Sequence, residues 1–132
     1  MLDIGASNVE VVRAAFASAD PLSSYERLAL DAEFDFTAIY PDQPLLRGIE
    51  QIRAFRDSGP WGRSIRFAPE RYFDVDEERV LVFVRATASG QQSGTPVEAA
   101  VAHEFTLREG LIVRVKVHPS RVEALKAVGL GE

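Results

Sequence analysis

Apolar residues recur every three to four positions near the start of the chain, the spacing of one face of a helix. Ser7 and Glu10 precede the run with capping-box spacing, so that a hydroxyl and a carboxylate can satisfy free amides of the first turn. The pattern predicts a helix from near Ser7 that ends before Pro21, because proline disfavours helical geometry in the preceding residue. Its apolar stripe consists of Val9, Val12, Phe16 and Ala19.

Three further elements are predicted in the first half of the chain. Ser23 and Glu26 repeat the cap spacing and predict a short helix that carries Leu28. Apolar residues then alternate with polar ones over 31–40, which predicts a strand. Helical spacing returns over 48–57, after a loop that contains two prolines.

The second half of the chain consists mainly of predicted strands. Their ranges are 65–75, 79–88, 96–108 and 111–117. Pro69 interrupts the first strand, and Glu109-Gly110 is a turn signal between the last two. A helix over 122–130 closes the chain. This order predicts an α+β domain with a mostly antiparallel sheet, and a curved sheet against helices leaves a concave apolar face that often binds a ligand.

Alternation assigns side chains to the two faces of the last strands. In 96–108, one face carries Val97, Ala99, Val101, His103, Phe105 and Leu107. In 111–117 we expect Val113, Val115 and Val117 on one face, opposite Arg114, Lys116 and His118.

Composition narrows the class of protein. The chain has 132 residues and no cysteine, which fits a single domain over 1–132 and excludes disulfides and thiolate chemistry. The net charge of -5 and the pI of about 5.1 argue against nucleic acid and anionic membranes as partners. Because no apolar run could span a bilayer and no signal-peptide pattern is visible, we expect a cytoplasmic protein.

Several segments resemble the nuclear transport factor 2-like superfamily, and more closely its SnoaL-like polyketide cyclase and ketosteroid isomerase branches. The matching segments are 8–13 (NVEVVR), 46–52 (LRGIEQI), 93–94, 105–114 (FTLREGLIVR) and 123–130 (EALKAVGL). The resemblance covers nearly the whole chain. It implies a cone-shaped, cystatin-like α+β barrel with the N-terminal helices on its concave side, and a homodimer.

The resemblance does not carry the steroid-isomerase reaction to this chain. The oxyanion-hole tyrosine of those enzymes falls on Val12, the proton-shuttling aspartate near Tyr40, and the oxyanion aspartate on His103. All three positions have changed residue type. The aspartate-arginine-aspartate set of the related epoxide hydrolases also finds no place, since 96–108 contains no aspartate.

His103 is the leading candidate for chemistry. It interrupts an apolar row on the face that should line the pocket, between Val101 and Phe105. An imidazole has an ordinary pKa near 6.5, which suits proton transfer, and burial would lower that pKa. The alternative is a structural histidine that bonds a neighbour.

Asp35 and Tyr40 are possible catalytic partners. Asp35 is a pocket base if its face of the strand turns inward, and is solvated if Phe34 and Phe36 point inward. Tyr40 offers a phenol at the pocket mouth or a packing ring beside Pro41.

The expected substrate contacts are mainly apolar. Arg85 is expected either to pair with an acidic substrate or to lie at the outer face, and Trp61 either to cover the pocket or to anchor the core. His118 should be exposed or at a subunit contact, and no metal site is expected. The full set of expected substrate contacts is Val12, Phe16, Trp61, Arg85, Val101, Phe105 and Val115.

These residues favour a protein that holds a hydrophobic small molecule. One hypothesis is a cofactor-free isomerase, cyclase or hydratase acting on a small hydrophobic carbonyl or polyketide-like compound by acid/base chemistry. The alternatives are a non-catalytic ligand binder in the same cone and a dimerising scaffold, whose outer face would carry mixed charges.

Overall fold

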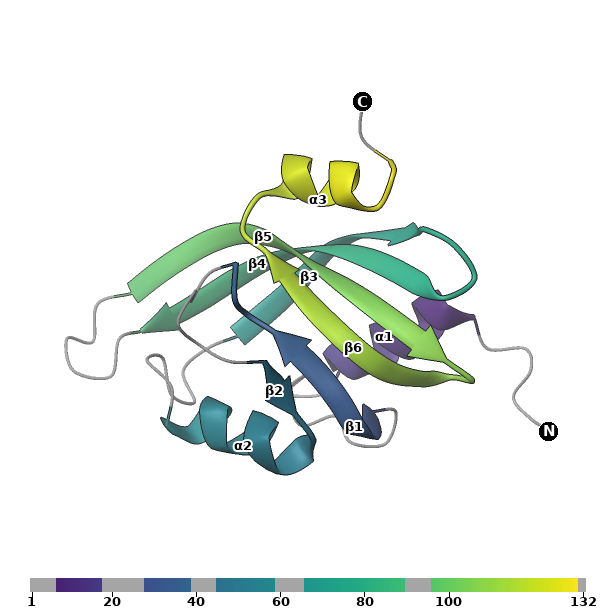
Figure 1. Ribbon diagram of the computed structural model, residues 1–132. Helices are drawn as coiled ribbons and strands as arrows, with labels where there is room; N and C mark the ends of the chain where they lie inside the picture. Colours follow the sequence, from purple (N-terminus) through teal and green to yellow (C-terminus); the bar gives the residue numbers. More distant parts are fainter. Residues whose placement is uncertain (1–6, 18–27, 39–44, 59–65, 90–95, 131–132) are drawn as a thin grey trace.

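The computed structural model describes residues 7–17, 28–38, 45–58, 66–89 and 96–130 (Figure 1). Its elements are α1 (Asn8–Ala17), β1 (Leu28–Asp35), β2 (Leu46–Arg47), α2 (Ile49–Ser58), β3 (Arg66–Asp74), β4 (Arg79–Ser89), β5 (Pro96–Arg108), β6 (Leu111–His118) and α3 (Arg121–Ala127). No helix of these segments is long and apolar enough to cross a membrane.

The strands form one six-stranded sheet with the order β2-β1-β6-β5-β4-β3. Strands β3 to β6 form an antiparallel meander, β2 pairs antiparallel with β1, and β1 joins β6 in parallel. The predicted α+β class with a mostly antiparallel sheet is confirmed.

Local signals account for the helix starts. At α1 the hydroxyl of Ser7 accepts from the amide of Glu10 at 3.1 Å, and the Glu10 carboxylate accepts from the amide of Ser7 at 3.0 Å. This is the predicted capping box. Ser120 caps α3 by accepting from the amide of Glu123 at 3.2 Å.

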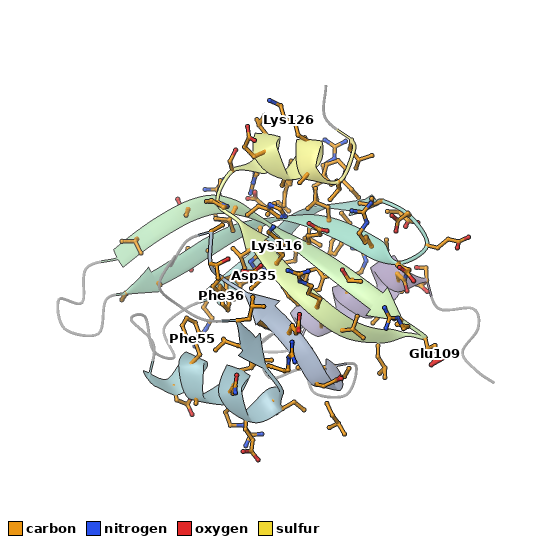
Figure 2. The ribbon with its side chains drawn as sticks, viewed as in Figure 1. Asp35, Phe36, Phe55, Glu109, Lys116 and Lys126 are labelled. Atoms are coloured by element: carbon orange, nitrogen blue, oxygen red, sulfur yellow. The ribbon has the colours of Figure 1, made fainter. Side chains whose placement is uncertain are left out.

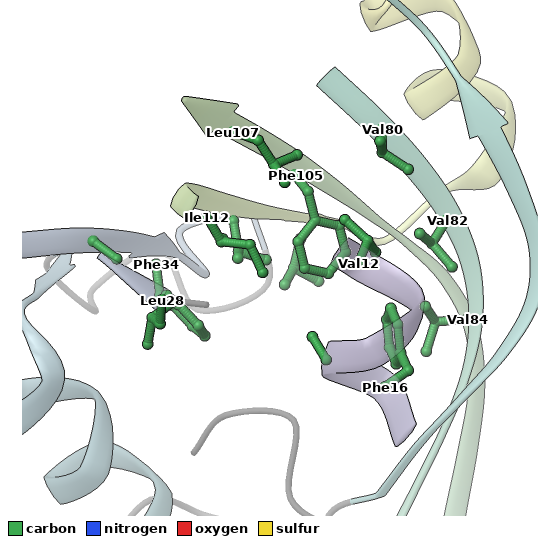
Figure 3. Packing of buried hydrophobic residues seen from close by; sticks show 14 of the residues in the cluster. Val12, Phe16, Leu28, Phe34, Val80, Val82, Val84, Phe105, Leu107 and Ile112 are labelled. Carbon is green, nitrogen blue, oxygen red and sulfur yellow. The ribbon is translucent and has the colours of Figure 1, made fainter. Parts of the chain in front are cut away.

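Helices α1 and α2 pack on one face of the sheet, and α3 packs on the other. We call the face covered by α1 the inner face and the face covered by α3 the outer face. Val12 and Phe16 of α1 belong to the inner cluster, around which the sheet curves in Figure 3. On the outer face, Leu81 and Ala102 pack against Ala124 and Val128 near the end of the chain. Since β4 contributes to both clusters, it is buried on two sides, as its dense apolar sequence predicts.

Irregular pairing in two strands changes which side chains share a face. In β3 the register shifts between Pro69 and Arg71, so both Phe67 and Tyr72 pack on the inner cluster although five positions separate them. Strict alternation would put them on opposite faces.

A second register shift lies between β5 and β6, at Thr106 and Leu107. Ile112, rather than the predicted Val113, therefore joins Val115 and Val117 in the inner cluster.

The prediction of a helix that carries Leu28 is wrong at that residue. Leu28 is the first residue of β1 and pairs with Ile112 of β6. The rest of the predicted helix lies outside the described residues.

Candidate functional site

A small cavity lies in the inner cluster, between α1 and the curved sheet. Its volume is about 20 Å³, and a water molecule needs about 10–15 Å³ measured in this way. Side chains therefore fill most of the expected hollow. The lining consists of Ala15, Phe16, Leu28, Phe34, Phe36, Phe67, His103, Phe105, Ile112, Val115 and Val117.

His103 is the polar side chain in this lining. It lies in β5 between Val82 of β4 and Val117 of β6, and it is 4% exposed. Among the described residues, no hydrogen-bond partner reaches its Nε2 atom. Buried polar atoms nearly always have such a partner, so an orphaned ring nitrogen in a cavity wall points to a ligand that supplies one.

Aromatic rings surround the imidazole. The Phe67 ring meets it edge to face, with centroids 4.8 Å apart and an angle of 76°. The Phe16 ring lies at 6.1 Å and the Phe105 ring at 6.2 Å. These rings pack around the imidazole and offer it no hydrogen bond of ordinary strength.

Burial and, to a smaller extent, the nearby His118 lower the pKa of His103 to about 3. The ring is therefore neutral at physiological pH. A neutral imidazole keeps one N–H donor and one acceptor nitrogen, so Nε2 can donate to a carbonyl or accept from a hydroxyl, depending on the tautomer.

Asp35 is neither a base in this cavity nor a solvated side chain, so both predicted environments are wrong. Phe34 and Phe36 turn inward, and Phe36 stacks on Phe55 of α2 at 5.1 Å (Figure 2). Asp35 lies on the outer face opposite Lys116, but it is only 6% exposed rather than solvated.

The Asp35 carboxylate is held by a hydrogen-bond network. It accepts from the hydroxyl of Thr37 at 2.6 Å, from the Thr37 amide at 2.9 Å and from Arg114 at 3.1 Å. Burial acts to raise the pKa of Asp35, but these hydrogen bonds outweigh it and the pKa lies below its usual value. A carboxylate held in this way serves the fold, and it has no access to a ligand at the inner face.

Arg85 also lies on the outer face and cannot bind a ligand in this cavity. Its guanidinium contacts Glu70 at 3.0 Å and Glu98 at 3.4 Å. The outer-face alternative for Arg85 is therefore the one that the structure supports, because Arg85 follows Leu81 and Phe83 in the alternation of β4.

The other predicted substrate contacts divide into three groups. Phe16, Phe105 and Val115 line the cavity. Val12 and Val101 are buried in the surrounding core but not in the lining. Tyr40 and Trp61 lie outside the described residues.

Sequence reasoning did not assign several lining residues to the site. They are Ala15, Leu28, Phe34, Phe36, Phe67, Ile112 and Val117. Helical spacing could have found Ala15, one turn from Val12 and beside Phe16. Alternation could have found Phe34, Phe36 and Val117, whereas the register shifts hide Phe67 and Ile112.

His118 is buried rather than exposed, at 7%. Its Nε2 lies 2.9 Å from a carboxylate oxygen of Glu104 on the outer face. The contact with His118 lowers the pKa of Glu104 although burial opposes the shift. The described residues contain no group of three or more histidines, aspartates or glutamates placed to hold a metal ion.

The arrangement of a six-stranded curved sheet with α1 against one face is that of nuclear transport factor 2-like (NTF2-like) proteins. A family model for the SnoaL-like domain matches residues 9–115, so the chain belongs to the SnoaL-like domain family. No curated protein matches the chain significantly.

Similar solved structures support the same fold. An NTF2-like protein of unknown function from Burkholderia pseudomallei K96243 is 18% identical, with a TM-score of 0.71 over 94% of this chain and 98% of that chain. TerC, co-crystallized with polyporic acid, is 21% identical, with a TM-score of 0.70 over 92% and 97%. A candidate SnoaL-like polyketide cyclase from Jannaschia sp. CCS1 is 20% identical, with a TM-score of 0.65 over 95% and 93%.

Proposed function

We propose that this chain binds a small, mainly apolar molecule in the inner-face cavity through one hydrogen bond to His103. The ligand carries a carbonyl or hydroxyl group, and that group bonds Nε2 of the neutral imidazole. The observation that carries the proposal is the buried Nε2 atom, which lines an apolar cavity without a partner among the described residues.

The surroundings of the imidazole favour an uncharged ligand. Apart from His103, the described lining is made of phenylalanine and aliphatic side chains. A carboxylate placed there would lose its hydration without gaining a cation, which costs far more than one hydrogen bond returns. The guanidinium of Arg85 and the ammonium of Lys116 belong to the opposite face.

A pair of matched probes tests this binding. Phenol and toluene have nearly the same size and differ in the hydroxyl group. We expect the protein to prefer phenol, and we expect His103→Phe to reduce that preference about tenfold, because one hydrogen bond is lost. Titration by calorimetry or by NMR shifts measures both ratios. An unchanged preference in the variant would show that His103 does not bind the ligand.

A second candidate function is catalysis at the same site without a cofactor. A neutral imidazole that donates a hydrogen bond to a carbonyl stabilises the enolate that forms when a base from solvent takes the adjacent proton, the first step of many isomerisations and cyclisations. Support comes from the neighbours, which include a candidate polyketide cyclase. Because Asp35 lies on the other face, His103 would have to act without that carboxylate.

Hydrogen exchange in a model ketone separates the two candidates. We would incubate 1-tetralone with the protein in deuterated water and follow the loss of its α-proton signal by NMR. A rate above buffer that His103→Phe abolishes supports the enzyme. Binding of phenol without accelerated exchange leaves the ligand-binding function alone.

A further inference from the structure

Among the described lining side chains of the cavity, one ring reaches the molecular surface. The other lining side chains are buried, none more than 9% exposed, whereas Phe67 is partly exposed. In the part of the chain that the structure describes, Phe67 is therefore the lining residue in contact with both the cavity and the outside.

The same ring covers His103. Its centroid lies 4.8 Å from that of the imidazole, closer than the centroids of Phe16 and Phe105. The planes of the two rings make an angle of 76°, so they meet edge to face. A molecule that reaches Nε2 from this side has to displace the Phe67 ring.

The backbone around Phe67 allows that displacement. Among the described strands, β3 lies at the edge of the sheet and pairs with β4 alone. Arg66, Ala68 and Pro69 are exposed, and the register shift follows at once. Irregular pairing in an edge strand re-aims side chains and opens at lower free energy than a central strand. Rotation of the ring toward solvent leaves the buried rings of the lining in place.

We propose that Phe67 is the gate of this cavity, so that its side chain sets how fast a ligand reaches His103 and how large that ligand can be. The inference rests on the proposed ligand-binding function. It also explains how a site of about 20 Å³ can admit a molecule larger than water: the ring rotates outward and the ligand takes its place against the imidazole.

Chemical labelling of His103 tests the gate without any ligand. Diethyl pyrocarbonate acylates neutral imidazoles, and peptide mass spectrometry measures the rate at each histidine. Phe67→Leu and Phe67→Ala should accelerate labelling of His103 by about tenfold, because the covering ring contact is lost. Phe34→Leu is the matched control, since it shortens a lining ring that is 3% exposed. His118 on the outer face reports global opening, and its rate should not change.

The outcomes separate the gate from the binding function. Equal His103 rates in Phe67→Leu and the wild type, or an equal increase in Phe34→Leu, would overturn the gate. An increase at both histidines would mean general unfolding and would also overturn it. An increase confined to His103 in the Phe67 variants supports the gate. If, in addition, neither the wild type nor Phe67→Ala prefers phenol to toluene, the gate stands and the proposed function falls.

Discussion

The two histidines of this chain have the same burial and opposite surroundings. His103 on the inner face is 4% exposed and His118 on the outer face is 7% exposed. The Nε2 atom of His118 lies 2.9 Å from the carboxylate of Glu104, which also forms an ion pair with Arg79 at 3.6 Å. His103 has phenylalanine rings and no partner for Nε2 among the described residues.

The difference separates a structural polar group from one available to a ligand. An imidazole that is buried with its partner costs the fold little, because the hydrogen bond offsets the lost hydration. An imidazole that is buried alone destabilises the fold. Such a group is typical of a functional site, where a ligand completes the hydrogen bond.

The largest expected effect is on acid stability. The pKa of His103 is about 3 in the folded protein and near 6.5 in the unfolded chain. Between these values the unfolded chain binds the extra proton, so the free energy of unfolding decreases as the pH falls from about 6.5 to about 3, by roughly 1.4 kcal/mol per pH unit. Urea denaturation of the wild type and of His103→Phe at several pH values measures this.

The variant supplies the control for that experiment. His103→Phe should lose this part of the pH dependence, whereas Asp35 and Glu104 titrate in both proteins and cancel in the difference. Parallel curves for the two proteins over this range would contradict the assignment of a strongly lowered pKa to His103.

Breaking the outer pair comes next in size. Glu104→Ala removes the acceptor of His118 and leaves that imidazole buried without it. We expect a loss of about 1–3 kcal/mol in the free energy of unfolding at neutral pH, less than for a fully enclosed pair because Glu104 keeps some contact with water. A variant as stable as the wild type would mean that the pair contributes nothing.

The same substitution at the two histidines should have opposite signs. His103→Phe removes a polar atom that has no partner among the described residues and puts an apolar ring among apolar neighbours, so we expect a gain of about 1 kcal/mol in the free energy of unfolding. His118→Phe leaves Glu104 without its histidine and should lose a similar amount. Thermal and urea unfolding at neutral pH compare the two. The contrast between the faces fails if both variants shift in the same direction.

The smallest effect is expected at an exposed ion pair. Lys126 lies 3.8 Å from Glu123 on α3, and both side chains are more than half exposed. Lys126→Ala should change the free energy of unfolding by less than about 0.5 kcal/mol, since water already solvates both charges. This variant calibrates Glu104→Ala: a loss of equal size in the two would place the Glu104 pair among ordinary surface contacts.

Structural features that depend on residues close together in the chain could be predicted from the sequence. The Ser7–Glu10 capping box places the start of α1, and the alternation of β5 assigns His103 to the face of Phe105. Both depend on neighbours close in the chain, where hydrogen-bond spacing and strand pleat decide the outcome.

Features that depend on partners far away in the chain could not be predicted from the sequence. The buried carboxylate of Asp35 accepts a hydrogen bond from Arg114, which is 79 residues away in the chain. His118 is buried beside Glu104 on the face that α3 covers, and alternation names a face without telling what covers it. Leu28 joins a strand through parallel pairing with β6, which overrides its local helix signal.

Glu70 has two roles in strand β3, one through its side chain and one through its place in the register. Its carboxylate accepts from Arg121 at 2.6 Å and so ties the first turn of α3 to the edge strand. Glu70 is also the extra residue at the register shift of β3, where the alternation of side chains between the two faces is interrupted. Deleting this residue would leave Phe67 and Tyr72 four positions apart, so plain alternation would keep both rings on the inner face. The strand would lose instead the carboxylate that fastens the last helix to its edge.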